Sequence, residues 1–196
     1  MYIDQYYIIL VVPALILSLI AQGMVTSAFA KYSKTANSRN ITGRDAARML
    51  MQQSGINDVS IETVPGNLSD HYDPSHKVLR LSEPVYDKPS IAAVGVAAHE
   101  TGHAIQHAKG YGPLVLRSTL VPAAQLGSSL GPILAMLGLF VSPLLFNIGI
   151  LLFTAAVAFT LITLPVEFNA SARAIAILRA NRILSEEELA GVKKVL

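Results

Sequence analysis

The sequence has no cysteine and few charged residues, and both shortages exclude classes of protein. Without cysteine, the 196-residue chain has no disulfide framework, thiol nucleophile or thiolate metal site. Charged residues make up 14% of the chain, well below the usual quarter. The net charge of +2 is too small to indicate a nucleic-acid partner. A hydrophobic content of 52% excludes a disordered or collagen-like chain.

Two long runs contain no charged residue and no histidine, and they divide the chain. The first covers the 26 residues 5–30, and the second covers the 49 residues 118–166. Runs of this kind exclude a wholly soluble globule. The residues outside the runs carry all the charges, at a density that is normal for a soluble protein. A water-soluble segment therefore lies between long apolar ones.

The lengths of the two runs predict three transmembrane helices. Crossing a hydrocarbon core takes roughly 20 helical residues. Residues 7–25 suffice for one crossing, and the second run provides two, near 121–140 and 144–164, with a tight turn around Ser142. Small residues spaced by four allow close helix packing, although chance also explains them in a Gly/Ala-rich segment: Gly127, Gly131 and Ala135.

Basic residues after the first apolar run indicate the orientation of the chain. They favour the cytoplasmic side of a membrane: Lys31, Lys34, Arg39, Arg44 and Arg48. The alternative is a signal peptide cleaved after Ala30, but the preceding segment lacks Lys and Arg and carries Asp4. We expect a retained anchor over 1–30, a cytoplasmic α+β region over 31–117, a membrane hairpin over 118–166 and a cytoplasmic helical segment over 167–196. The protein is then a multi-pass protein of the plasma (inner) membrane.

The soluble stretch predicts short helices around a small sheet. Thr42 is a candidate N-cap of a helix that ends near Gly55. Residues 59–64 alternate apolar and polar and predict a strand, while the turn at residues 73–76 separates two β-like runs, 70–72 and 77–81. We expect about three strands in a mainly α protein.

Two more helices are predicted around this region. One runs through residues 90–107, with Pro89 in its first turn. The other begins at a capping box formed by Ser185 and Glu188 and is still running at Leu196.

The strongest chemical signal is the motif His99-Glu100-Thr101-Gly102-His103 on this predicted helix. At about 100° per residue, the two histidines lie about 40° apart and one turn along the axis. They can therefore offer two imidazole nitrogens to one ion, while Glu100 can face a water molecule on that ion. The alternative is a helix with two solvated or core histidines. Gly102 is expected to let a neighbouring backbone come close.

A catalytic zinc needs a third protein ligand and an open position. His107 lies about 12 Å along the axis from His99, too far to share an ion with both other histidines. Glu167 is the better candidate, because it is the first charge after the long uncharged run and the hairpin returns it to the cytoplasmic surface. The alternative is an interfacial glutamate that merely marks the end of a membrane helix.

Three segments carry a resemblance to a known family: LSDHYDPSHKVLRLSEPVY, VAAHETGHAIQHA and LPVEFNASARA. The chain resembles the gluzincin metallopeptidases, and most of all the bacterial YugP-type membrane zinc peptidases, over nearly its whole length. A more distant likeness is to the Ste24/HtpX membrane proteases. The resemblance implies a zincin-like catalytic region with His99, His103 and Glu167 as Zn²⁺ ligands and Glu100 as catalytic acid/base.

The resemblance also implies an endopeptidase that hydrolyses a peptide or membrane-protein substrate at the cytoplasmic face of the lipid bilayer. The distant relatives commonly have an Asp four residues after the third ligand, where this chain has Ser171. A hydroxyl still accepts from an imidazole N–H, but without negative charge. Members of the family usually continue into one further membrane helix beyond the position of Leu196.

Four further residues are weaker candidates for a role in hydrolysis. Groups that can stabilise an oxyanion, each with a plain structural role as the favoured alternative, are Tyr111, His71, Tyr72 and Arg173. Either strand of the predicted hairpin is a candidate edge for pairing with an extended substrate.

A non-catalytic scaffold, in which zinc only holds the helices together, is the rival function, but structural zinc sites normally have four protein ligands. An intramembrane protease is disfavoured, because Lys88 and Lys109 bracket the motif helix. The sequence does not address the oligomeric state.

Overall fold

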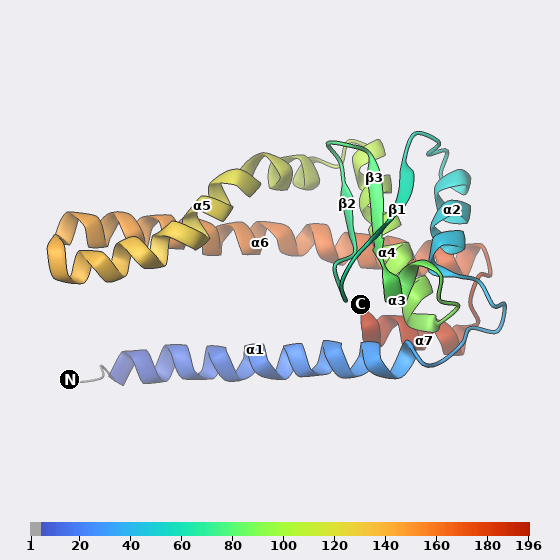
Figure 1. Ribbon diagram of the computed structural model, residues 1–196, viewed down its shortest axis with the longest axis horizontal. Helices are drawn as coiled ribbons and strands as arrows, with labels where there is room; N and C mark the ends of the chain where they lie inside the picture. Colours follow the sequence, from blue (N-terminus) through green and yellow to red (C-terminus); the bar gives the residue numbers. More distant parts are fainter. Residues whose placement is uncertain (1–4) are drawn as a thin grey trace. The chain divides into compact units, whose positions relative to one another are not determined.

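A computed structural model describes residues 5–196 as a mainly α chain with one small sheet, which confirms the predicted fold class. The helices are α1 (Gln5–Tyr32), α2 (Gly43–Gln53), α3 (Glu83–Tyr86), α4 (Ile91–Ala108), α5 (Gly112–Val141), α6 (Pro143–Ala180) and α7 (Glu186–Val195). The strands are β1 (Ser60–Val64), β2 (His71–Asp73) and β3 (Val78–Ser82). Figure 1 labels these elements along the chain.

The chain forms two compact units. The first consists of Met1–Thr101 and Ala174–Leu196, and the second of Gly102–Arg173. The division falls inside α4 and inside α6, each of which is one continuous helix. The first unit thus holds the sheet, α2 and α7, while the second holds α5 and most of α6.

The sheet of the first unit has the order β1-β3-β2 (Figure 1), with β1 parallel and β2 antiparallel to β3. β3 is buried along its length because it lies in the middle, and Leu79 and Leu81 pack with Ala93 and Ala97 of α4. The predicted three strands are confirmed. Of the two strands that were candidates for a sheet edge, β2 is an edge strand and β3, which covers most of residues 77–81, is central.

The predicted helix caps are confirmed, with one correction. Thr42 Oγ accepts from the N–H of Asp45, and Ser185 forms the capping box with Glu188. Pro89, however, lies outside α4, which begins at Ile91. Its carbonyl accepts from Asn37 N–H at 2.9 Å, so a contact with a distant loop replaces the helical role that the sequence predicts.

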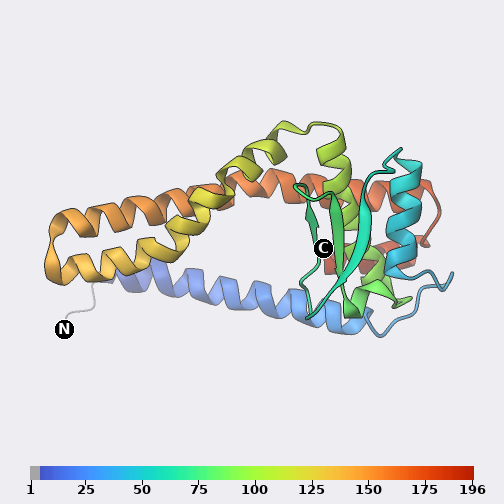
Figure 2. The same ribbon diagram turned by 45° about the horizontal axis from the view of Figure 1, so that its top comes forward.

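The main core of the first unit lies where α2, α4, the end of α6 and α7 meet. Its fully buried members include Leu50, Val94, Leu178 and Val192. α7 also lies beside the end of α1 in both views (Figures 1 and 2), where a Cβ on Gly191 would lie only 2.8 Å from the Tyr32 ring. The charged segment after α6 is therefore folded into this unit rather than trailing from it.

The second unit is built on the α5–α6 hairpin. Its turn is at Ser142, as predicted, and a Cβ on Gly127 would lie 2.6 Å from the Leu152 carbonyl oxygen. Gly131 is similarly close to the backbone of Phe153, so the small residues do serve close packing. Phe140, 86% exposed, is one of many exposed apolar side chains on the hairpin.

Three of the described helices are long and apolar enough to cross a membrane. These candidate spans are Val12–Tyr32, Gly112–Val141 and Pro143–Ala180, and each exceeds its predicted crossing at one or both ends. α4, which carries the histidine motif, is not among the spans found in the described residues.

Candidate metal centre

The histidine motif lies in the second half of α4, as predicted. Ser90 begins this helix by accepting from Ala93 N–H at 3.1 Å, and small residues then let it lie flat against the sheet. The α-helical spacing puts His99 and His103 one turn apart on the same side. The motif is thus displayed on a regular, well-buried helix.

The structure brings the three predicted ligands together. His99, His103 and Glu167 each have a possible ligand atom within 4.8 Å of such an atom on the other two. His103 is buried, at 6% exposure, while the other two are half-buried. Two imidazoles and one carboxylate at this spacing form a donor set that suits zinc.

A buried amide fixes the orientation of the His103 ring. Gln106 is fully buried, and its Nε2 donates to the Val166 carbonyl at 2.9 Å and to Asn169 Oδ1 at 3.0 Å. Because both partners are acceptors, the remaining amide oxygen accepts from His103 Nδ1, at 3.0 Å. In this tautomer the lone pair is on Nε2, the nitrogen that faces Glu167 and through which the ring would bind a metal.

Glu167 lies between a cation and this imidazole. Its Oε2 is 3.3 Å from His103 Nε2, and its Oε1 is 3.0 Å from a guanidinium nitrogen of Arg117 on α5. The Glu167 side chain is 38% exposed and that of Arg117 is 32% exposed, so the ion pair is partly buried. The carboxylate is thus held by Arg117, and its other oxygen faces the imidazole of His103.

Glu100 is held by the edge of the sheet. Its Oε2 accepts a hydrogen bond from the backbone N–H of Tyr72 on β2, at 3.1 Å. Burial, followed by the negative charges of Asp58 and Asp73, raises the pKa of the Tyr72 hydroxyl to about 12. The hydroxyl is therefore a neutral donor near pH 7.

Gly102 permits the close approach of α4 and α6. A Cβ at this position would lie 2.8 Å from the carbonyl oxygen of Ala170 and 3.2 Å from its Cα. Ala170 is three residues beyond Glu167, so the contact lies next to the third ligand. The expectation that Gly102 admits a neighbouring backbone is confirmed.

Other candidates from the sequence have structural contacts. Arg173 Nε donates to Asn169 Oδ1 at 2.6 Å, and His71 Nδ1 lies 2.8 Å from the Ser69 carbonyl. Tyr111 is the N-cap of α5. The support of a histidine by Ser171 stays a prediction, and the acceptor of His103 Nδ1 is Gln106.

Sequence reasoning missed three residues of this centre. Gln106 follows His103 by three, a spacing that places two side chains on one face of a helix. Arg117 is the last charge before the uncharged run and Glu167 is the first after it. No pattern in the sequence indicated Asn169, because its contact with Gln106 depends on how α6 packs against α4.

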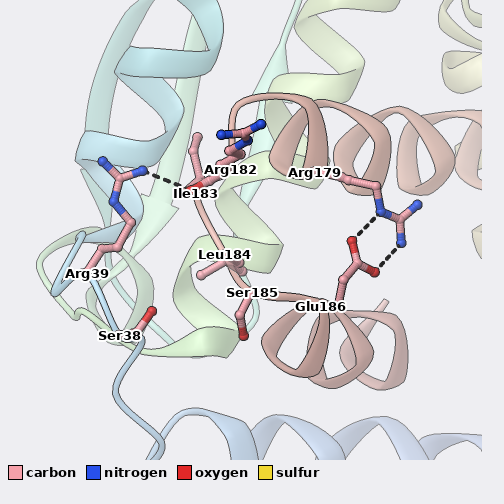
Figure 3. Close-up of a pocket in the computed structure, with 8 residues that line it drawn as sticks. All are labelled: Ser38, Arg39, Arg179, Arg182, Ile183, Leu184, Ser185 and Glu186. Carbon is pink, nitrogen blue, oxygen red and sulfur yellow. Dashed lines mark hydrogen bonds and ion pairs between the residues drawn. The ribbon is translucent and has the colours of Figure 1, made fainter.

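A separate pocket of about 510 Å³ in the first unit offers no such chemistry (Figure 3). Its one carboxylate, Glu186, is held by the Arg179 guanidinium through two contacts of 2.6 and 2.8 Å. Arg39 donates to the carbonyl of Arg182 at 2.9 Å. The lining contains no histidine and no cysteine.

Comparison with known proteins agrees with this chemistry. The profile of a family described as "Putative neutral zinc metallopeptidase" matches residues 7–196. The chain belongs to this family. A relative in Bacillus subtilis (strain 168), named "Putative membrane protease YugP", is 49% identical over 191 residues, which cover 97% of this chain and 85% of the relative. No solved structure gives a significant match.

The family assignment and the three apolar helices identify a membrane protein of a zinc metallopeptidase family. The residues present fit the ion that the family name implies. His103 is bonded through Nδ1 to Gln106, which directs its Nε2 toward the carboxylate of Glu167, 3.3 Å away.

Proposed function

We propose that this protein is a membrane-anchored zinc endopeptidase of the gluzincin type, which hydrolyses peptide bonds at the cytoplasmic membrane face. The observation that carries the proposal is the convergence of His99, His103 and Glu167, with Glu100 next to the first ligand. Family membership supports the same reaction class.

In this proposal the two histidines and Glu167 would hold the ion, each through one atom. A zinc ion bound there lowers the pKa of a bound water molecule and polarises the carbonyl of the scissile peptide bond. Gln106 keeps His103 in the ligating tautomer. Three ligands of this kind favour a catalytic site over a structural one, which normally has four.

Glu100 acts as general base and then as general acid. Its carboxylate takes a proton from the attacking water and delivers it to the leaving amine. The Tyr72 N–H donates to Oε2 of this carboxylate at 3.1 Å, which orients the side chain. Glu100 is a base here and not a metal ligand.

The edge of the sheet supports a peptide substrate. β2 is an edge strand, and the Tyr72 N–H on it donates to Glu100. An extended peptide or membrane-protein segment can pair with such an edge and place its backbone beside the base. Basic residues after α1 support a cytoplasmic location of this surface.

The test is metal analysis and a proteolysis assay on the purified full chain in detergent or nanodiscs. We expect about one zinc per chain, because three ligands and a water complete a catalytic site. Glu167→Ala should lose much of the metal, since an uncharged two-histidine site binds zinc poorly. Glu100→Gln should retain it and lose hydrolysis by several orders of magnitude, because Gln keeps the shape and removes the basicity.

Undiminished hydrolysis by Glu100→Gln would show that another base, or a contaminating protease, is at work. A chain that binds zinc and cleaves no membrane or peptide substrate would favour the scaffold function. Full zinc occupancy in Glu167→Ala would make that residue a mere interfacial glutamate.

A further inference from the structure

We infer that Arg117 is a positioning residue for Glu167, which keeps that carboxylate to single-oxygen coordination of the metal. The inference rests on the proposed metal site and adds a residue that neither the motif nor the family name assigns. It starts from the fact that the two charges bracketing the 49-residue uncharged run, Arg117 and Glu167, are paired.

The pair joins α5 to α6, the two helices of the hairpin. Arg117 lies in the second turn of α5, and Glu167 lies in α6, 24 residues after its first residue. Close backbone contacts at Gly127 and Gly131 fix how α5 lies along α6. The guanidinium reaches Glu167 from the part of α5 that precedes Pro122.

The two oxygens of Glu167 have different partners. Oε1 is 3.0 Å from the Arg117 guanidinium, and Oε2 is 3.3 Å from His103 Nε2. This ion pair, between partly buried groups, holds the first oxygen on the side of Arg117. The second oxygen lies on the side of the imidazole, where the metal would bind.

The number of oxygens that Glu167 supplies decides how open the site is. A carboxylate that binds through both oxygens raises the coordination number and occupies space that water or substrate needs. With Arg117 on Oε1, two imidazoles and one oxygen make three ligands and leave a fourth, tetrahedral position open. Arg117 thus protects the reactive position without touching the metal.

Arg173 is the other arginine near this part of α6, and its contact is different. Its Nε donates to Asn169 Oδ1 at 2.6 Å, the same oxygen that accepts from Gln106. Arg173 therefore supports the amide network on His103, while Arg117 supports the carboxylate.

Cobalt(II) tests the inference directly, since its visible absorption is strong in four-coordinate sites and weak in five-coordinate ones. The full-length protein in nanodiscs is stripped of metal and loaded with Co²⁺, as wild type, Arg117→Gln, Arg117→Lys and the control Arg48→Gln, which changes an exposed arginine on α2. We expect intense tetrahedral bands for the wild type and the control. Arg117→Gln should bind about one Co²⁺ with clearly weaker bands, and Arg117→Lys should recover most of the intensity.

Each outcome bears on a different claim. Wild-type protein that binds no Co²⁺ or Zn²⁺ contradicts the proposed metal site. Wild-type spectra in both Arg117 variants contradict the positioning role alone, and a lowered melting temperature with unchanged spectra would reduce the pair to a structural one. If Arg117→Gln fails to fold, Arg117→Lys decides, because a cation beside Oε1 should preserve most of the tetrahedral absorption. A folded Lys variant with clearly weaker bands would then contradict the inference.

Discussion

Replacing Gly102 by alanine should damage the metal centre through a contact between backbones. The added Cβ would lie 2.8 Å from the Ala170 carbonyl oxygen, about 0.6 Å short of an ordinary contact at 3.4 Å. The atoms that it meets are backbone atoms of α6, so no flexible side chain can turn away. α4 and α6 must therefore separate locally.

The size of this displacement determines the expected loss. Alanine favours a helix over glycine by about 1 kcal/mol, while overpacking costs about 1–3 kcal/mol, so the net change in the free energy of unfolding is modest. Metal sites, however, need their ligands within about 0.5 Å of the productive geometry. Because Glu167 is one turn from Ala170, we expect zinc affinity to fall by at least about tenfold, the lower end of typical losses around a metal site.

The assay is a competition titration with a coloured zinc chelator, with Gly112→Ala as the matched control. A Cβ on Gly112 meets nothing within 4 Å, and this glycine is in the same unit. We expect the control Gly112→Ala to bind zinc with wild-type affinity. Gly102→Ala should bind zinc more weakly, with a melting temperature similar to that of the wild type. Equal affinities in all three proteins would refute the reasoning, because the close contact would then have no bearing on the ligands.

Three further predictions concern the buried amide, the turn of the sheet and the topology. Gln106→Leu should lower the melting temperature, and should lower zinc affinity by about 10–100-fold, because the His103 N–H loses its acceptor. Thermal shift assays with and without zinc measure both effects, and unchanged values would contradict the role of Gln106 in orienting His103. Hydrogen bonds from His76 and Arg80 hold the pKa of Asp73 well below its usual value. Asp73 therefore adds stability that is present above about pH 4, its ordinary range, and is lost as pH falls further. Melting temperatures should show Asp73→Asn less stable than wild type at pH 7, with the difference shrinking below about pH 4; a constant difference would oppose this. Reporter fusions near residue 60 and after residue 180 should report cytoplasm and a fusion at Ser142 the outside, and an external signal at residue 60 would overturn the orientation.

Local features of the fold were predictable from the sequence because they depend on nearby residues. Thr42 and the Ser185–Glu188 pair are capping residues whose partners lie three positions away. The hairpin turn at Ser142 follows from the length of the uncharged run. The two histidines and Glu100 were found because a helix fixes their relative directions.

Features that depend on distant packing were not predictable. Pro89 lies outside α4 because its carbonyl accepts from Asn37, a contact that no local pattern indicates. The central position of β3 follows from its parallel pairing with β1, and alternation of residues does not specify strand order. The contacts of Gln106 with Asn169 and of Arg117 with Glu167 join residues 63 and 50 positions apart.

Anomalous diffraction at the zinc absorption edge, on crystals of the zinc-loaded protein, tests the central claim most directly. The account predicts one peak about 2.0–2.2 Å from a ring nitrogen of His99, from His103 Nε2 and from one oxygen of Glu167, with Glu100 outside bonding distance. A peak elsewhere, a closed site with four protein ligands, or Glu100 bound to the metal would contradict it.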